Sequence, residues 1–175
     1  GQKGFSIIDR ESEDTRFFAP GTSENSLPYN QVNTILVTAN GNVYLGLYGG
    51  GMCSVADKVI PYAVDPLSEI RRRFGTNTVH GIFASDSSWI WMGIPDNGFV
   101  LYDPVSQKVV RHNEIPAFRN LLSISSAFAI KERSCTGEIC IGTYSEGLWI
   151  YDAAAGKVRT VTTETCPVMR NHNIL

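Results

Sequence analysis

Three aspartates at regular positions are the first residues in this 175-residue chain that could do chemistry. Asp9, Asp103 and Asp152 each end a short apolar run. The carboxylates of a hydrolase site take different roles around one bond, whereas these three stand at the same place in successive similar segments. An aspartate at the end of a strand accepts hydrogen bonds from the backbone of the following turn. We therefore interpret them as turn residues and assign the chain no catalytic residue.

The histidines give no sign of a metal or nucleophile site. His80, His112 and His172 have none of the spacings that metal ligands show, and no nucleophile-elbow motif is present. A Ser-His-Asp set brought together only in space stays open, since such sets have no sequence signature. We expect no metal, no cofactor and no enzymatic activity.

The cysteines are compatible with an oxidising compartment but do not require one. They are Cys53, Cys135, Cys140 and Cys166. A two-residue turn at Thr136-Gly137 would place Cys135 opposite Glu138 and Cys140 opposite Arg133. A disulfide between the two would then be diagonal and too long without distortion. We favour a buried thiol at Cys140 and leave the disulfide state open.

Composition excludes several classes of protein. The chain has 15 Lys+Arg, 17 Asp+Glu, a net charge of −2, and 43% hydrophobic residues against 18% charged ones. This is a globular composition, and the near-neutral balance argues against a nucleic-acid partner. No apolar run reaches the length that spans a bilayer, so we expect no membrane insertion of this segment.

Glycines reveal an internal repeat. Gly93 follows Gly46 by 47 residues, and Gly142 follows Gly93 by 49. Each is followed five residues later by a second glycine, at Gly51, Gly98 and Gly147. A phosphate-binding loop at 49–51 is rejected, because neither a helix nor a Lys-Ser/Thr pair follows it. We interpret both sets of glycines as turn residues.

Each copy reads as four short strands. Val32–Val37 is a first strand, Asn40-Gly41 a hairpin signal, Phe99–Asp103 a third strand and Lys108–Arg111 a fourth. Four antiparallel strands per 47–49 residues is the blade of a β-propeller. The sequence therefore predicts an all-β fold: a partial β-propeller of about 3.5 four-stranded antiparallel blades.

The repeat sets expected boundaries. They are a half blade at 1–24 with third and fourth strands, blades at 25–76, 77–117 and 118–167, and the start of a further blade at 168–175. In the first full blade we favour an insertion near 56–64, with the fourth strand at 70–73. The alternative puts the fourth strand at 59–64 and a short helix at 68–73.

The repeat resembles a known family. Asn30, Val32 and Gly41-Asn-Val-Tyr-Leu-Gly-Leu-Tyr-Gly-Gly-Gly51 resemble the two-component regulator propeller repeat, as does Gly147-Leu-Trp-Ile-Tyr-Asp152. Tyr44 and Cys140 depart from its usual tryptophan. The resemblance implies the glycan-detecting sensor region of a hybrid two-component system of the Bacteroidetes type. Such a region is periplasmic, its parent is anchored in the inner membrane, and any histidine kinase lies outside this chain.

Loops of this fold emerge on one face and carry its binding residues. Aromatic and hydrogen-bonding side chains there suit a polar ligand such as a sugar. The expected ligand-binding residues are Tyr48, Asp96, Asn97, Tyr144, Glu146, Arg119 and Asn120, with Arg72 and Arg73 nearby. A merely solvated surface is the alternative. Trp89, Trp91 and Trp149 could stack on sugars, but we favour a place in the blade core.

The leading hypothesis is a non-catalytic segment of a periplasmic sensor propeller that senses, or supports sensing of, glycan-type ligands for transmembrane signalling. The alternatives are a polysaccharide-active propeller enzyme and a scaffold propeller of a surface or secretion complex. About 3.5 blades would expose edges that a closed ring hides. The expected partners are therefore the remainder of a parent propeller or a second copy of the chain in a homodimer, and an oligosaccharide ligand.

Overall fold

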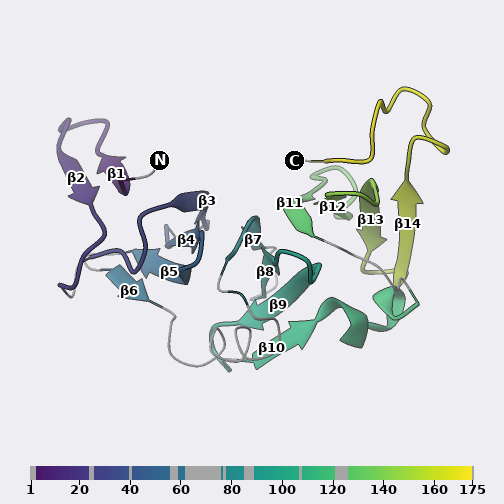
Figure 1. Ribbon diagram of the computed structural model, residues 1–175, viewed down its shortest axis with the longest axis horizontal. Coiled ribbons are helices and arrows are strands. Elements are labelled where there is room, and N and C mark those ends of the chain that lie inside the picture. The colour runs from purple at the N-terminus through teal and green to yellow at the C-terminus, as the bar shows by residue number, and fades with distance from the viewer. Residues whose placement is uncertain are drawn as a thin grey trace. The chain divides into compact units, whose positions relative to one another are not determined.

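Short apolar runs and glycine-containing turns fold the chain into antiparallel sheets (Figure 1). The computed structural model describes residues 3–23, 26–39, 41–55, 59–61, 76, 78–84, 89–106, 108–120 and 126–174. Contacts divide the chain into two units, Gly1–Val79 and His80–Leu175. Each unit is described by itself.

The first unit holds two sheets. A two-stranded sheet pairs β1 (Phe5–Ile8) with β2 (Thr15–Phe18). A four-stranded sheet has the order β3 (Val32–Val37), β4 (Val43–Leu47), β5 (Gly51–Val55) and β6 (Val59–Pro61). Phe18 from β2 packs with Leu45 and Leu47 of β4 in one buried cluster, so burial of apolar area joins the two sheets.

The second unit holds two four-stranded sheets and two short 3₁₀ turns. The first sheet is β7 (Ile82–Ala84), β8 (Ile90–Gly93), β9 (Phe99–Asp103) and β10 (Lys108–Arg111). The turns η1 (His112–Glu114) and η2 (Pro116–Phe118) follow it. The second sheet is β11 (Ala127–Glu132), β12 (Ile139–Thr143), β13 (Leu148–Asp152) and β14 (Lys157–Val161). Antiparallel neighbours in chain order make each sheet a meander.

The core of the second unit lies between its two sheets. Trp91 of β8 and Trp149 of β13 are both buried there with Phe118 of η2, whose ring is stacked on that of Trp149 at 6.1 Å. Trp91 also stacks on Phe99, with ring centroids 5.3 Å apart. The expectation that Trp91 and Trp149 belong to the blade core is confirmed.

The predicted fold class is confirmed. Strands β3, β9 and β10 begin and end at the predicted residues. Among the described residues, every pair of neighbouring strands is antiparallel, and three of the sheets have four strands. The chain is therefore all-β and built from propeller-like blades.

The favoured position of one fourth strand is wrong. β6 at Val59–Pro61 pairs antiparallel with β5, with Val55 opposite Val59 and Cys53 opposite Pro61. This strand falls inside the expected insertion at 56–64. The pairing therefore supports the alternative, in which the fourth strand lies at 59–64. A β-branched pair directly after a third strand was a sufficient strand signal. The competing segment 70–73 lies outside the described residues.

The turn between β11 and β12 also differs from the expected one. Arg133 N donates to Glu138 O over 2.9 Å, so the loop has four residues, 134–137, in place of two. Gly137, with φ of +69°, supplies its left-handed residue. The shift puts Cys140 opposite Lys131 and leaves Cys135 exposed in the loop. Cys140 is half-buried, and all four cysteines are free thiols.

The glycines have two separate roles, and only one was predicted. Gly51, Gly98 and Gly147 have φ near +70° and begin the third-strand region as turn residues. The other three glycines instead leave room for a segment that follows their own sheet along the chain. They are Gly46, Gly93 and Gly142. A Cβ on Gly142 would lie 2.7 Å from Ile174 Cγ2, and one on Gly46 2.9 Å from Val79 Cγ1. Turn geometry is therefore the wrong account of the first set.

Candidate functional site

Ser126 fixes the two loops that lie at the candidate site. The loop from β8 to β9 donates from Asp96 N to Ser126 Oγ over 2.8 Å. The loop from β12 to β13 donates from Tyr144 N to Ser126 O over 3.0 Å. Because Ser126 is buried, its hydroxyl and carbonyl hold both loops in a defined place.

The first unit repeats this arrangement around the loop from β4 to β5. Gly49 N donates to Thr78 Oγ1 over 2.9 Å, and Tyr48 N donates to Gln31 O over 3.0 Å. Thr78 and Ser126 occupy the same place in the repeat, two residues before His80 and Phe128. The backbone amides of Tyr48, Gly49, Asp96 and Tyr144 are thus already satisfied.

Three rings gather beside Ser126. The rings of His80 and Phe128 are stacked, with centroids 4.2 Å apart and planes at 19°. Phe128 and Tyr144 are tilted at 38°, with centroids 6.0 Å apart. Phe128 is the extra residue where the pairing of β11 with β12 shifts register, and a bulge of this kind re-aims a side chain. We name His80, Phe128, Tyr144 and Asp96 the seam cluster.

Asp96 brings a carboxylate to the seam cluster on a strained turn. Its φ is +56°, a left-handed conformation that costs a non-glycine residue about 1 kcal/mol. The equivalent residue of the first unit is Gly49, with φ of +75°. Within the part of the chain that the structure describes, the Asp96 carboxylate accepts no hydrogen bond.

The pKa of His80 is shifted by its surroundings in the seam cluster. Burial lowers the pKa of His80 below its ordinary value, because desolvation penalises the imidazolium. The negative charge of Asp96 acts in the opposite direction. At neutral pH the seam cluster therefore presents a neutral imidazole, two other rings and one carboxylate.

The predicted site residues separate into groups. Asp96 and Tyr144 come together at Ser126. Asn97 Nδ2 donates to Pro95 O over 2.9 Å and so braces the turn that holds Asp96. Glu146 Oε1 accepts from Ser145 Oγ over 2.6 Å in the neighbouring loop.

The other predicted residues lie elsewhere or were not described. Tyr48 belongs to the first unit and is half exposed. Arg119 and Asn120 are exposed at the end of η2, which packs against β14 and η1. Arg72 and Arg73 lie outside the described residues.

Sequence reasoning missed His80, Phe128 and Ser126. A signal was present: His80 and Phe128 share one repeat position, as do Thr78 and Ser126. It was overlooked because a bulge breaks the alternation from which side-chain direction is read.

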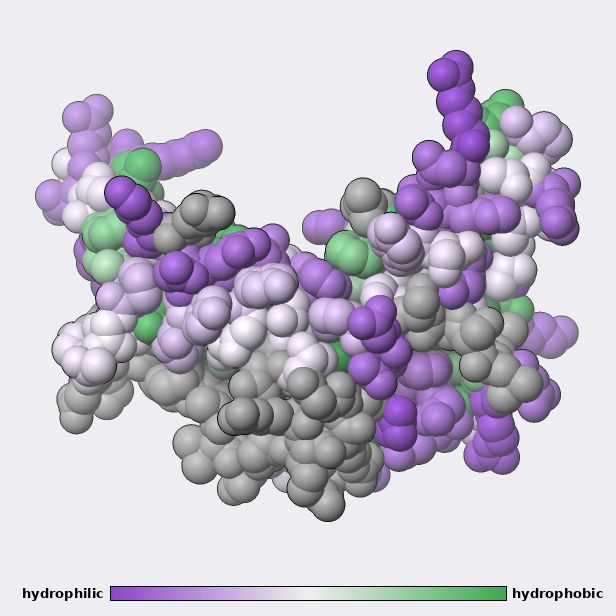
Figure 2. Space-filling view, in the orientation of Figure 1, coloured by the Kyte–Doolittle hydropathy of each residue, from purple (hydrophilic) through white to green (hydrophobic). Residues whose placement is uncertain are grey.

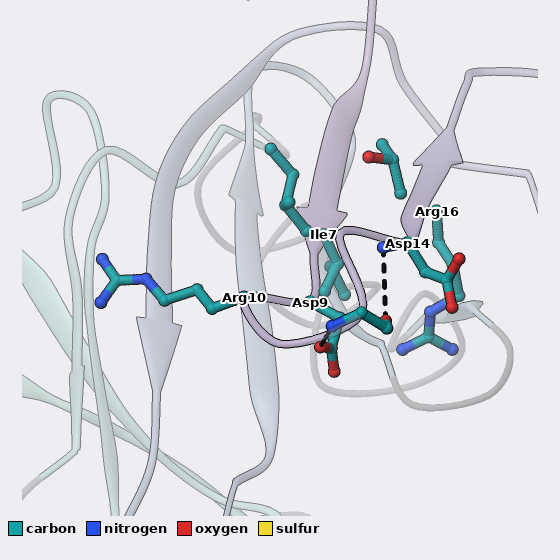
Figure 3. A pocket seen from close by; sticks show the side chains of 8 residues that line it. Ile7, Asp9, Arg10, Asp14 and Arg16 are labelled. Carbon is teal, nitrogen blue, oxygen red and sulfur yellow. Dashed lines mark hydrogen bonds between the residues drawn. The ribbon is translucent and has the colours of Figure 1, made fainter.

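The surface hollow beside β1 and β2 is formed by the turn that connects these two strands. It is lined by residues 7–10, 12 and 14–16, and Figure 3 shows Arg10 extending away from it. Asp9 Oδ1 accepts from the backbone N of Glu11 and of Ser12, each over 2.9 Å.

The same capping bond recurs at the other two predicted aspartates. Asp103 Oδ1 accepts from Val105 N over 3.0 Å, and Asp152 Oδ1 accepts from Ala155 N over 2.9 Å. The predicted turn role of the three aspartates is confirmed.

Two kinds of feature are absent from the described residues. No helix there is long and apolar enough to cross a membrane. No three His, Cys, Asp or Glu side chains of that part gather as metal ligands would.

Comparison with known proteins gives structural neighbours only. No family model matches the chain, and no curated protein does. The extracellular domain of the hybrid two-component system BT4673 from B. thetaiotaomicron matches 99% of this chain with a TM-score of 0.72 and 17% identity. That of BT3049 from the same organism matches 98% with a TM-score of 0.68 and 21% identity.

A third neighbour belongs to another system. PorZ, a surface component of the type-IX secretion system of Porphyromonas gingivalis, matches 99% of this chain with a TM-score of 0.67 and 17% identity. The chain spans 22%, 20% and 26% of the lengths of the BT4673, BT3049 and PorZ chains. The described chain therefore has the fold of one part of these larger extracellular and surface proteins.

Proposed function

We propose that this chain is a non-catalytic segment of the extracellular sensor propeller of a hybrid two-component system, and that it helps to bind a glycan-type ligand. The observation that carries the proposal is the match of nearly the whole chain to two sensor-system domains with TM-scores of 0.72 and 0.68. The repeat pattern of the sequence resembles the same class of protein independently of the structure.

The proposed role includes a place in the cell and a set of partners. The segment lies in the periplasm, its parent is anchored in the inner membrane, and the kinase belongs to another part of that parent. Its protein partners are the remainder of the propeller or a second copy. A sensor needs no catalytic group, and the recurrent aspartates serve turns.

The test uses the intact parent protein in native membrane vesicles. Kinase autophosphorylation is measured with and without a panel of oligosaccharides, because a sensor must bind its ligand differently in its two signalling states. We expect at least one oligosaccharide to change the phosphorylation level. A parent with no kinase, or one whose phosphorylation no oligosaccharide alters, contradicts the proposal.

The match to PorZ favours a second candidate, a scaffold propeller of a surface or secretion complex. Cross-linking in intact cells separates the two. A scaffold is recovered with secretion components at the cell surface, whereas the sensor is recovered in the inner membrane with its kinase.

A further inference from the structure

The seam cluster combines an available aromatic face with an available carboxylate. Tyr144 is 52% exposed, while His80 and Phe128 are half-buried and cover each other's faces. Neither the Tyr144 hydroxyl nor the Asp96 carboxylate has a hydrogen-bond partner among the described residues. Both can therefore meet a ligand without breaking an existing bond.

The backbone that carries these two groups is fixed by its neighbours. Ser126 binds the backbone of both residues, and the ring of Phe128 lies against Tyr144. A site whose groups are already ordered loses little conformational entropy when a ligand binds. The strained backbone of Asp96 fits this reading, because left-handed non-glycine residues concentrate at binding sites.

The charge of the seam cluster limits the class of ligand. A carboxylate accepts strong hydrogen bonds from hydroxyl groups and repels a ligand carboxylate or sulfate. The cation sites built from aromatic residues are cages of several open ring faces, whereas the facing sides of His80 and Phe128 are used in their stack. One open phenol ring beside one acceptor suits an uncharged ring with an apolar face and hydroxyls at its rim.

We propose that the seam cluster binds one residue of a neutral oligosaccharide, with the ring of Tyr144 stacking on the sugar and Asp96 accepting its hydroxyls. This inference rests on the proposed sensor function and specifies its ligand as uncharged, in contrast to uronate-containing or sulfated glycans. His80 and Phe128 are positioning residues that support the Tyr144 ring.

The test measures binding by calorimetry on the intact protein. The probes are neutral gluco-, manno- and xylohexaose, hexagalacturonate as the acidic sugar, and hexamethylenediamine as an organic cation. We expect a neutral hexasaccharide to bind, and hexagalacturonate and the diamine to bind at least ten-fold more weakly.

Three variants assign the binding to the seam cluster. Asp96→Gly keeps the left-handed turn while removing the carboxylate, and Tyr144→Ala removes the ring. Each should weaken neutral-sugar binding at least ten-fold. The matched control is Tyr29→Ala, which removes another exposed tyrosine ring of the first unit and should change binding less than two-fold. The melting temperature of Asp96→Gly should equal or exceed that of the unsubstituted protein. Weaker binding by this variant would then reflect a lost contact and not unfolding.

The possible outcomes distinguish the ligand class, the site and the sensor function. Preferred binding of hexagalacturonate or of the diamine overturns the neutral class. Neutral-sugar binding that Asp96→Gly and Tyr144→Ala leave intact overturns the site, while the sensor function stands. If no sugar binds and kinase phosphorylation still responds to another ligand, the inference fails while signalling remains. If neither occurs, the proposed function fails as well.

Discussion

At the scale of single residues, Gly93 is restricted by the carbonyl of Ala127. A Cβ at Gly93 would overlap that backbone oxygen, which belongs to the first strand of the next sheet. Gly93→Ala should therefore lower the free energy of unfolding by about 3 kcal/mol, as overpacking against backbone does.

Gly156→Ala is the matched control for this prediction. Gly156 has φ of +61° and open space where its Cβ would lie, so only backbone strain of about 1 kcal/mol is expected. Urea unfolding of both variants measures the difference. Equal losses would show that the close approach at Gly93 is not tight.

Cysteine chemistry should differ sharply between two positions. Burial raises the pKa of Cys53 to about 12, so only about one thiol in ten thousand is ionised at pH 8. Cys135 is exposed. Iodoacetamide followed by mass spectrometry should alkylate Cys135 in the folded protein and reach Cys53 only after denaturation. Early labelling of Cys53 would contradict its burial between β4 and β6.

His112 should make the fold sensitive to acid. Burial, and secondarily the charge of Arg111, lowers its pKa, while the bond from Nδ1 to Phe99 O, 3.3 Å long, acts the other way. The unfolded chain therefore takes up this proton first. Stability from the neutral imidazole is full above about pH 6.5 and falls as the pH drops below that value.

His112→Asn tests this pH dependence, because the Asn amide can still donate to the Phe99 carbonyl. Unfolding free energies at pH 7.5, 6.5, 5.5 and 4.5 should fall less steeply in the variant than in the parent. Identical slopes would show that His112 is not the group responsible.

At the scale of elements, equivalent strands bury the same position differently. Ile35 of β3 is 54% exposed, whereas Ile130 at the same register of β11 is 2% exposed and packs with Trp91. Ile130→Thr should cost about 2–3 kcal/mol because it buries a hydroxyl. Ile35→Thr should stay within about 0.5 kcal/mol. Thermal unfolding of the two variants measures the loss of stability in each. Equal losses would mean that Ile35 of β3 is buried like Ile130.

Elements were predictable where a local signal sufficed. β9 and β13 begin after a left-handed glycine and end at an aspartate that caps the turn, so both ends were marked in the sequence. The turn at 134–137 was not marked, because Thr136-Gly137 fits a two-residue and a four-residue loop equally well. Only the cross-strand pairing of Arg133 with Glu138 decides between them.

At the scale of the whole molecule, apolar residues remain on the surface of the first unit. Ile8 and Phe17 are exposed on the sheet of β1 and β2, and Ile35 and Val37 on β3. Figure 2 shows hydrophobic spots over β1 and β2 amid a mainly hydrophilic described surface. Exposed apolar area on a two-stranded sheet favours association, so we predict that the remainder of a propeller or a second copy covers it.

Sedimentation of the 175-residue chain checks this prediction. The unsubstituted chain should self-associate as its concentration rises, and the Phe17→Lys variant should be more monomeric. Glu11→Gln at an exposed position raises the net charge by one, as Phe17→Lys does, and serves as the control on total charge. A monodisperse monomer at all concentrations would contradict a second copy as the occupant.

The candidate site was predictable only in part. Asp96 and Tyr144 were found because loops at the ends of strands carry binding residues. Their meeting at Ser126 depends on how one sheet lies against the next, which no single repeat specifies. The ring of Phe128 was hidden by the bulge in β11.

The contacts that join successive strands of the repeat have a consequence for divergence. Bare glycine backbone recurs at these junctions, with a main-chain carbonyl against Gly93 and Gly142 and one small hydroxyl at Thr78 or Ser126. Side chains outside these junctions and outside the buried core can therefore be exchanged over evolutionary time without altering the spacing of the sheets. This accounts for a chain that keeps a TM-score of 0.72 with a neighbour of which only 17% of its aligned residues are identical. Substitutions should accumulate on strand faces and loop tips long before they reach Gly46, Gly93 or Gly142.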